Sequence, residues 1–536
     1  MASNETGVAM ILGDPALAAA QAARGQTRVT LDEVFRRIAQ RRPDALALAD
    51  APNRQSFTDG APRRLTYAEA EHMVAAIAGR VRRMGLPVDA IVGVQMPNIV
   101  ENILVMLGLL RAGMIVAPLP LLWRRADAVA ALARIGAKAL ITCGRVDGFN
   151  HCQFAMRVAA EVFAIRYVCG FGQNLPDGVV PFDDLFTAEK LDPIPPIDRE
   201  RQANAAAHLA AITFDVGEGG LLPVARNHPE LLAGGLDVLL ETRIAKDSNI
   251  LSTLAPSSFA GISLTLLPWL LSGGALVLHH AFDPDILARQ RRDDRCDTLI
   301  LPGSVAFRVA EAGAIAGAGP TAVIAAWRSP ERLTASPAWR EPESVLVDVS
   351  IFGEAGLVAA RRGVGGRPSA VQFGPVVAPR GSTGAIVLAE LVRTPAGTVA
   401  LRGPMVPRNS FPPGIERSGL PYFTIGHGGL IDTGYTCRID SLTQGIVLTG
   451  PPSGIVSVGG YRFPLRDLQD VVGRIDGDAT LAALPDPLVG QRLIGNASDR
   501  STMQAALNAV GVNPIVVAAF RDRSERGIAG GPAAVS

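Results

Sequence analysis

The stretch from Ile212 to His228 reads ITFDVGEGGLLPVARNH, and it decides how the chain around it is interpreted. An apolar run ends at Phe214, a cluster of glycines follows, and a segment typical of a helix begins at Pro229. Strand, glycine-rich turn and helix is the layout of a phosphate-binding loop, because glycine lets backbone N–H groups close around an anion. The order of these elements therefore predicts a phosphate cradle at the turn.

The side chains of this turn do not suit a polyphosphate. Asp215 and Glu218 stand beside the glycines Gly217 and Gly220, and the turn contains neither a hydroxyl nor a lysine. Each carboxylate would face a polyphosphate, and one like-charge pair at ~5 Å with an effective dielectric constant of ~20 costs on the order of 3 kcal/mol. Unless Asp215 and Glu218 point away or hold a metal, we expect a nucleoside triphosphate to bind poorly here.

Composition sets the outer limits of the interpretation. The chain has 536 residues, which is too long for one compact core, so two or more domains are expected. Apolar residues make up 48% and charged residues 19%, as in a packed globular protein, and a net charge of +1 gives no electrostatic case for nucleic acid or an anionic membrane. Lysine occurs only at Lys138, Lys190 and Lys246, so no lysine follows position 246.

Cysteine and histidine usage gives no sign of a metal site or a disulfide framework. The five cysteines are scattered without CxxC pairs, which fits buried thiols in a reduced, cytoplasmic compartment. The seven histidines show no metal-ligand spacing. Two apolar stretches, 99–123 and 262–278, are interrupted by proline, glycine or charged residues, so we predict buried helix and strand pairs and no membrane span. The N-terminus has no signal-peptide layout.

Strands and helices alternate through most of the chain, and the strands are apolar on both faces. This pattern predicts an α/β protein with mainly parallel sheets covered on both sides. We expect a large N-terminal domain of two parallel-type α/β subdomains plus a small β-barrel-like subdomain, followed by a small, mobile α+β C-terminal domain. The predicted boundaries are a disordered tail at 1–27, the large domain at 28–449, the small domain at 450–523 and a second disordered tail at 524–536.

Several local elements are predicted from capping and periodicity. Helices are expected over Leu31–Arg41, with Thr30 as N-cap, and over Tyr67–Met84, and Asn98 is expected to cap the helix that follows it. Near the end of the chain, the stretch VNPIVVAAF at 512–520 is predicted as the last strand.

The order of these segments resembles the adenylate-forming superfamily, which includes acyl-CoA synthetases, luciferases and peptide-synthetase adenylation domains. The resemblance rests on LTYAEAEHMVAAIAGRVRRMGL, VGVQMPNIVENILVMLGLLRAGMIVAPLPLLWR, LLPWLLSGGALVLH, GRP, ALRGP, TG and GGYRF in that order and spacing. It implies a reaction in which a carboxylate attacks the α-phosphate of ATP, giving an acyl-adenylate, after which the small C-terminal domain rotates and a thiol such as coenzyme A takes the acyl group. ATP with Mg²⁺ and coenzyme A are the cofactors implied if that activity is retained.

The positions that serve ATP in the family depart from its pattern. The phosphate loop matches Asp215–Ala225 without the family's threonines, serine and lysine. The aromatic–Gly–x–Thr–Glu motif matches Phe352–Gly356, where Phe352 and Gly353 are kept and the threonine and glutamate are lost. Tyr435 stands in place of the ribose-binding aspartate, and Asp432 is interpreted as a turn residue rather than its substitute. The hinge arginine and aspartate and the C-terminal lysine are also absent.

Other positions follow the family. The GGYRF segment, with Gly459, Gly460, Tyr461 and Arg462, lies on the thiol-transfer side of relatives; a β-bulge with a packed tyrosine is an equally weighted interpretation. The acyl pocket of relatives corresponds to the region of Phe259, Gly261 and Leu264.

Three functional hypotheses follow. The first is an acyl-CoA synthetase-like ligase of fatty acid metabolism that works with unusual residues. The second, which we favour, is a pseudoenzyme that binds an acyl group, an acyl thioester or a partner enzyme, because the losses fall together on one substrate. The third is a thiol-transfer or hydrolytic enzyme that dispenses with ATP, but the sequence contains no nucleophile elbow. No catalytic residue and no metal ligand is assigned, and the acyl group, pathway and oligomeric state stay open.

Overall fold

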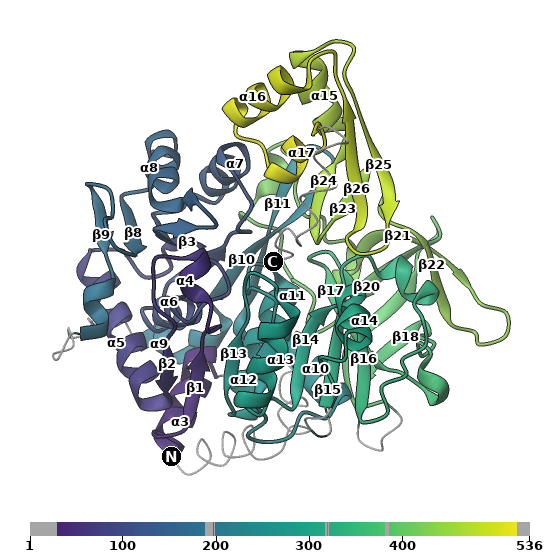
Figure 1. Ribbon diagram of the computed structural model, residues 1–536, viewed down its shortest axis with the longest axis horizontal. Coiled ribbons are helices and arrows are strands. Elements are labelled where there is room, and N and C mark those ends of the chain that lie inside the picture. The colour runs from purple at the N-terminus through teal and green to yellow at the C-terminus, as the bar shows by residue number, and fades with distance from the viewer. Residues whose placement is uncertain are drawn as a thin grey trace.

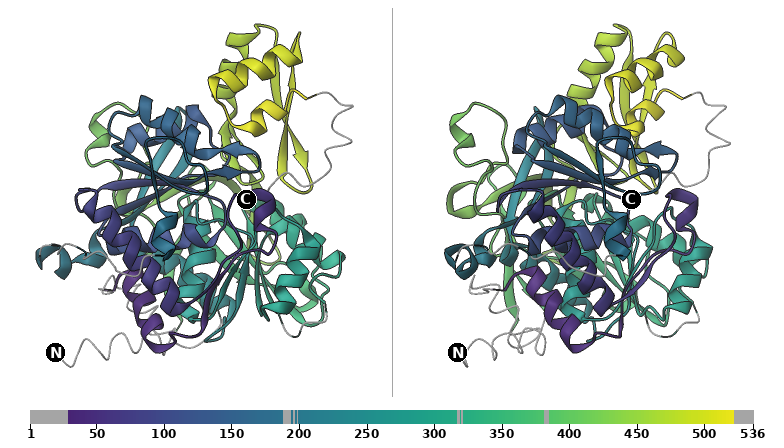
Figure 2. Two further views of the ribbon diagram at one scale, coloured as in Figure 1. Left: turned by 60° about the vertical axis from the view of Figure 1, so that its left-hand side comes forward. Right: turned by 90° about the vertical axis from the view of Figure 1, so that its left-hand side faces the viewer.

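Two large sheets form the body of the protein, and the C-terminal region stands above them in every view (Figures 1 and 2). The computed structural model describes residues 29–187, 194, 197, 199–316, 319, 321–380 and 385–521. The tails predicted at 1–27 and 524–536 lie outside the described residues. Within the described part of the chain, no helix is both long and apolar enough to span a bilayer.

The larger sheet has eight strands in the order β17-β16-β15-β14-β12-β13-β1-β2. Its core strands run parallel, and the edge strands β17 and β2 are antiparallel to their neighbours. The bounds are β1 (Leu46–Ala49), β2 (Arg64–Thr66), β12 (Ile250–Ser252), β13 (Leu276–Leu278), β14 (Thr298–Pro302), β15 (Thr321–Trp327), β16 (Ser344–Phe352) and β17 (Gly356–Arg361).

The second sheet has seven strands in the order β11-β10-β4-β3-β5-β8-β9, and all its pairs are parallel except the hairpin β10–β11. The bounds are β3 (Ile91–Gln95), β4 (Ile115–Pro118), β5 (Ala139–Cys143), β8 (Tyr167–Phe171), β9 (Val179–Pro181), β10 (Leu209–Gly217) and β11 (Gly220–Asn227). The prediction of an α/β protein with mainly parallel sheets is therefore confirmed. The physical reason is that strands apolar on both faces are stable only when helices cover both faces of the sheet.

Helices cover these sheets, and the two long helices Val100–Arg111 and His228–Thr242 are almost wholly buried. Those of the sheet region are α3 (Leu31–Arg41), α4 (Arg54–Phe57), α5 (Tyr67–Arg83), α6 (Val100–Arg111), α7 (Arg125–Ile135), α8 (His151–Glu161), α9 (Arg199–Ala203), α10 (His228–Thr242), α11 (Phe259–Gly261), α12 (Leu267–Ser272), α13 (Pro284–Asp293) and α14 (Gly303–Glu311). Thr30 caps α3 as predicted, accepting a hydrogen bond from the Glu33 N–H. The predicted cap at Asn98 is wrong: α6 begins one residue later, and the Asn98 amide donates to the Ser252 carbonyl instead.

A five-stranded antiparallel sheet packs beside the larger sheet, in the order β18-β19-β20-β21-β22. Its bounds are β18 (Gly374–Ala378), β19 (Ile386–Arg393), β20 (Thr398–Arg402), β21 (Ile431–Ile439) and β22 (Ile446–Gly450). The small β-barrel-like subdomain expected from the sequence is therefore an antiparallel meander in which each strand pairs with the next, with β18 and β22 at its two edges.

The C-terminal region contains a four-stranded antiparallel sheet in the order β24-β23-β26-β25, with helices on one side. Its bounds are β23 (Ile455–Val458), β24 (Tyr461–Pro464), α15 (Leu465–Ile475), β25 (Thr480–Asp486), β26 (Gly490–Asn496), α16 (Arg500–Val510) and α17 (Pro514–Ala518). The prediction of a last strand over 512–520 is wrong. Asn513 accepts a hydrogen bond from the Ile515 N–H, and Pro514 occupies the first helical position, so this apolar run forms the short helix α17.

Candidate functional site

The glycine-rich turn is the tip of a β-hairpin rather than a strand-to-helix loop. The strand β10 continues past Phe214 to Gly217, which pairs with Gly220 at the start of β11. Gly219 and Gly220 have φ values of 85° and 107°, a backbone region that favours glycine, and this permits the two-residue turn. The helix α10 follows only at His228, so its N-terminus lies a full strand away from the turn.

Asp215 is held by a set of short contacts and faces inward. Its carboxylate forms an ion pair with Arg462 of the C-terminal region, and the two side chains are only 10% and 14% exposed. The carboxylate also accepts hydrogen bonds from the Glu354 N–H at 3.0 Å and the Val216 N–H at 2.7 Å. The expected repulsion of a polyphosphate by Asp215 must therefore be corrected, because Arg462 neutralises this carboxylate and fills the space in front of it.

The backbone around this ion pair is adapted to it. Burial acts to lower the pKa of Arg462, but Asp215 and the other acidic neighbours outweigh it, so the pKa lies above its ordinary value. Gly353 has a φ of 57°, and a Cβ at that position would overlap both Arg462 and Asp215. A glycine is thus required at Gly353 to make room for the ion pair.

Glu218 occupies the exposed tip of the hairpin. It is solvent-exposed, and a Cβ on the adjacent Gly219 would lie 2.7 Å from Pro421, which places the tip against the loop that precedes β21. Of the two carboxylates predicted to oppose phosphate, Glu218 is thus in water and Asp215 is paired.

Glu354 lies inside the protein, below the hairpin. Its carboxylate accepts hydrogen bonds from the Thr213 hydroxyl at 2.5 Å and the Phe259 N–H at 3.0 Å, and it lies 3.8 Å from Arg226. Burial raises the pKa of Glu354 to about 7, and Arg226 opposes this shift. These donors occupy the carboxylate, and Glu354 also lines the small cavity beside Asp215. Within the described ranges, no three His, Cys, Asp or Glu side chains are grouped to hold a metal ion.

Tyr435, which the resemblance predicted to stand in place of a ribose-binding aspartate, lies in the packed interior. Its ring is 1% exposed and meets the ring of Phe352 edge-on, with centroids 5.6 Å apart. Its hydroxyl lies 3.5 Å from the carbonyl oxygen of Arg328, and burial raises its pKa. Asp432 accepts hydrogen bonds from the Thr398 hydroxyl and the Gly434 N–H, both at 2.9 Å, which is the geometry of a turn residue.

The GGYRF segment closes the cleft from the C-terminal side. Gly459 and Gly460 form a two-residue turn between β23 and β24 with φ values of 57° and 91°. The β-bulge of the alternative interpretation is therefore wrong, whereas its packed tyrosine is confirmed, because Tyr461 is buried in the apolar core. The Leu122 N–H donates to the Tyr461 hydroxyl at 3.1 Å, and Arg462 reaches Asp215. All of these thiol-face candidates are therefore at the junction with the sheets.

Two further hydrogen bonds, one from a side chain and one from the backbone, hold the C-terminal region against the sheets. Arg332 donates to the Asp486 carbonyl at 2.6 Å, and the Ala126 N–H donates to the Gly511 carbonyl at 3.0 Å. The junction is thus stabilised by contacts on more than one side of the cleft.

The three acyl-pocket candidates belong to the packed core. Phe259 and Leu264 are fully buried, and a Cβ on Gly261 would overlap the Ala255 carbonyl. Arg226 lies over the Phe259 ring at 3.9 Å. The adjacent cavity has a volume of about 80 Å³, and Asp215 and Arg462 lie in its wall. The other residues that line it are Pro120, Trp123, Phe214, Val216, Ser257, Ser258, Ala260, Arg328, Ile351, Gly353, Glu354, Gly460 and Tyr461.

A larger cavity of about 480 Å³ lies on the other side of Phe352, between the larger sheet and the five-stranded sheet. Its walls include the apolar side chains of Phe352, Leu391 and Leu448, and its polar lining includes Arg367 and Arg438. Asp215, Gly353 and Tyr435 do not line it. It has the size and mixed lining typical of small-molecule sites.

Two arginines of the site were missed from sequence. Arg226 is buried on β11, where burial lowers its pKa to about 10, and Arg328 directly follows β15. A charged residue just after an apolar parallel strand is a usable signal for Arg328, because ligand sites gather at the carboxyl ends of such strands. Arg226 gives no such signal, because its role depends on contacts made far along the chain.

The fold and the cleft together define an α/β protein in which an α+β C-terminal region packs over a glycine hairpin. A model of the AMP-binding enzyme family matches residues 35–335, more than half of the chain. The chain belongs to this family of adenylate-forming, acyl-CoA synthetase-like ligases.

Several curated proteins and solved structures are similar to the chain. It is 25% identical over 484 residues to 2-hydroxy-7-methoxy-5-methyl-1-naphthoate–CoA ligase of Streptomyces carzinostaticus, covering 84% of this chain and 82% of that protein. It is 29% identical over 169 residues to long-chain fatty acid transport protein 1 of Bos taurus, covering 32% of this chain and 23% of that protein. A third match, 33% identical over 90 residues, covers 17% of this chain and 2% of the beauvericin nonribosomal cyclodepsipeptide synthetase of Beauveria bassiana.

The solved structures share the fold over nearly the whole chain. MbtA of Mycobacterium smegmatis superposes with a TM-score of 0.62 at 20% identity, covering 93% of this chain and 92% of that one. The amide bond synthetase McbA of Marinactinospora thermotolerans gives a TM-score of 0.66 at 18% identity, covering 90% and 94%.

Proposed function

We propose that this protein is a member of the AMP-binding family that does not run the family's ATP chemistry and instead binds a small apolar acid or its thioester. The observation that carries the proposal is the closed cleft: Arg462 pairs with Asp215 directly against Gly353, and Tyr435 packs on Phe352. The remaining cavity of about 80 Å³ is well below the ~300 Å³ at which small-molecule pockets begin.

The residues present do not fit a magnesium triphosphate. The glycine turn from Asp215 to Ala225 offers no hydroxyl or lysine, and its one buried carboxylate is paired with Arg462. The glutamate nearest the family's magnesium position, Glu354, accepts internal hydrogen bonds. No lysine follows position 246, so nothing equivalent to the family's C-terminal lysine exists. These residues therefore do not support a reaction step that uses ATP.

The cavity of about 480 Å³ supports the binding role. Leu391, Leu448 and Phe352 offer apolar surface, while Arg367 and Arg438 offer positive charge. An apolar body with an acidic group matches that lining, because apolar walls supply affinity and a few charged groups fix orientation. A fatty or aromatic acid is the ligand class we propose for it.

One experiment decides between binding and ligation. Titration of Mg²⁺–ATP by calorimetry and pyrophosphate exchange with fatty and aromatic acids should both give background signals. Micromolar ATP binding accompanied by exchange would refute the proposal. Two variants separate the causes of exclusion: a gain of ATP affinity in Glu218→Ser would indicate charge repulsion, whereas a gain only in Arg462→Ala would indicate that the seat is filled.

The acid-binding half of the proposal has its own test. Titration with fatty and aromatic acids in the absence of ATP should show saturable binding to the wild-type protein. Leu448→Trp fills the cavity and should abolish it, while the control Leu442→Trp, at a position 92% exposed in the neighbouring turn, should leave it unchanged. Equal binding by both variants would place the acid elsewhere and refute this assignment.

A second candidate is an acid–thiol ligase acting after the C-terminal region has moved away. The similarity to the naphthoate–CoA ligase over 84% of this chain favours it. Pyrophosphate exchange above background, with any acid of the panel, would support this candidate over the first.

A further inference from the structure

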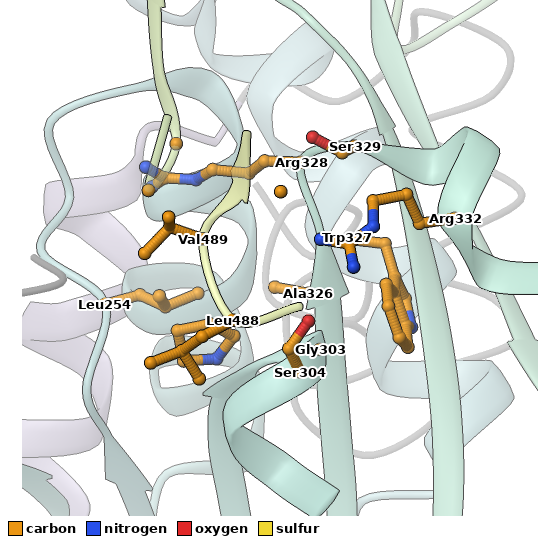
Figure 3. A pocket seen from close by; sticks show the side chains of 14 residues that line it. Leu254, Gly303, Ser304, Ala326, Trp327, Arg328, Ser329, Arg332, Leu488 and Val489 are labelled. Atoms are coloured by element: carbon orange, nitrogen blue, oxygen red, sulfur yellow. The ribbon is translucent and has the colours of Figure 1, made fainter. Parts of the chain in front are cut away.

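Two cavities meet at one arginine where the C-terminal region joins the sheets. The cavity of about 80 Å³ described above and a second of about 60 Å³ are both lined by Arg328 and Gly460. The second cavity is also lined by Leu254 from the sheet region and by Leu488 and Val489 from the C-terminal region. Figure 3 shows the side chain of Arg328 extended across this pocket above Val489.

The guanidinium of Arg328 has no counter-ion among the described residues. No carboxylate of the described residues lies within 4.0 Å of it, and no hydrogen bond joins it to any of them, although its backbone carbonyl lies near the Tyr435 hydroxyl. Burial lowers the pKa of Arg328, and Tyr461 and Glu354 only partly oppose this effect. The comparably placed Arg362, in contrast, pairs with Asp348 at 2.8 Å.

A cation that is removed from water without a partner is unfavourable, because it loses hydration and gains no compensating charge. Arg328 is not sealed in the core, however, since it faces both cavities. The lining also carries the hydroxyls of Ser257, Ser304 and Ser329, which can donate to an anion.

We propose that this junction binds a small oxyanion through Arg328. A guanidinium donates two parallel hydrogen bonds to a carboxylate or a phosphate, which makes oxyanions its preferred ligands. Each cavity is smaller than the ~150 Å³ cavity that admits benzene, so the ligand has only a few non-hydrogen atoms. The shared chemistry is that of inorganic phosphate and of a short-chain carboxylate whose tail contacts Leu254 and Leu488.

Binding at this point stabilises the closed arrangement. Arg328 and Leu254 belong to the sheet region, whereas Gly460 and Val489 belong to the C-terminal region. An anion that contacts both regions binds the docked form better than the undocked form and shifts the protein toward it. The inference rests on the proposed function, because it requires that the cleft is not a working ATP site, and it adds a second ligand and a means of regulation.

The test uses the full chain and four probes: inorganic phosphate, sulfate, acetate and butyrate. Calorimetry on the wild-type protein should show one-site binding of at least one probe. Arg328→Gln should raise its Kd by at least about tenfold, because it removes a charge-assisted bidentate contact. The control Arg289→Gln alters an exposed arginine on α13 and should leave the Kd unchanged.

Hydrogen exchange supplies the second readout. The bound probe should slow exchange of the Gly459 and Gly460 amides in the wild-type protein and in Arg289→Gln, but not in Arg328→Gln. Binding of phosphate alone, of the carboxylates alone or of both supports the proposal. The probes that bind then show whether the natural oxyanion is a phosphate or a carboxylate.

Two results overturn the inference: no binding of any probe to the wild-type protein, or equal binding to Arg328→Gln. If Arg328→Gln does not fold, Arg328→Lys takes its place, because it keeps the charge and loses the bidentate geometry; an unchanged Kd in that variant overturns the inference as well. ATP binding refutes the proposed function and removes the premise of this inference, whereas a failure with the four probes refutes only the oxyanion site.

Discussion

The ion pair between Asp215 and Arg462 should carry much of the free energy that docks the C-terminal region. The perturbation is a double-mutant cycle with Asp215→Asn, Arg462→Gln and the combined variant. Because both side chains are at least 86% buried, removing either partner leaves the other desolvated, which costs about 3 kcal/mol by comparison with other buried pairs. The coupling itself should be about 2 kcal/mol, the value typical of a charge-assisted hydrogen bond.

The assay is native-state hydrogen exchange of the amides from Gly459 to Phe463, which report opening of the junction rather than global unfolding. A coupling of about 2 kcal/mol means that the effect of the double variant on the opening constant falls roughly thirtyfold short of the product of the two single-variant effects. The exposed pair Arg308–Glu311 provides a control cycle in which no coupling should be resolved, since its side chains are 68% and 62% exposed. Single-variant effects that add to within about 0.5 kcal/mol would refute the reasoning, because independent sites behave in that way.

Three further predictions follow from the buried groups. Burial raises the pKa of Glu354 from 4.5 to about 7. The stabilisation of the folded state by the protonated carboxyl group is therefore present below pH 4.5 and is lost as pH rises through 7, which lowers the free energy of unfolding by about 3 kcal/mol. Urea titrations over that window should show that Glu354→Gln flattens this fall. Thermal unfolding should show Tyr435→Phe costing less than about 1 kcal/mol, since the hydroxyl contact is long, and Tyr435→Ala about 3–5 kcal/mol through the cavity it leaves. Gly353→Ala should undock the C-terminal region in small-angle scattering, whereas Gly454→Ala, which has a similar positive φ but open space around its Cβ position, should leave it docked; an equal effect of both would reduce the role of Gly353 to backbone strain.

Local order in the sheets could be predicted from the sequence. Apolar strands such as Ile91–Gln95 are predictable from their composition, and the helix that follows Thr30 is predictable from the capping chemistry of that residue. The helix Pro514–Ala518 was missed because a short apolar run suits either element, and the Asn–Pro pair that starts the helix was outweighed by the β-branched residues. The strand β11 was missed because Pro223 is tolerated at the edge of a sheet, where its missing N–H leaves no bond unmade.

The site was less predictable because its charges are paired across long distances in the chain. The acidic character of Asp215 was visible in the sequence, but its partner was not, since 247 residues separate it from Arg462. Burial of Glu354 depends in the same way on Thr213 and Phe259, which come from other elements. Periodicity and motif spacing carry no information on such pairings, so the sign of a local charge was predictable and its neutralisation was not.

The same separation has a consequence for how the protein is made. A ribosome releases Asp215 long before Arg462, so the nascent chain can assemble both large sheets while this carboxylate is still hydrated. Only when the hairpin from Ile455 to Pro464 emerges can water leave the cleft and the carboxylate become enclosed. A chain cut short before Ile455 would therefore leave the Asp215 carboxylate exposed to water and free to bind a cation, whereas in the full-length protein Arg462 covers it.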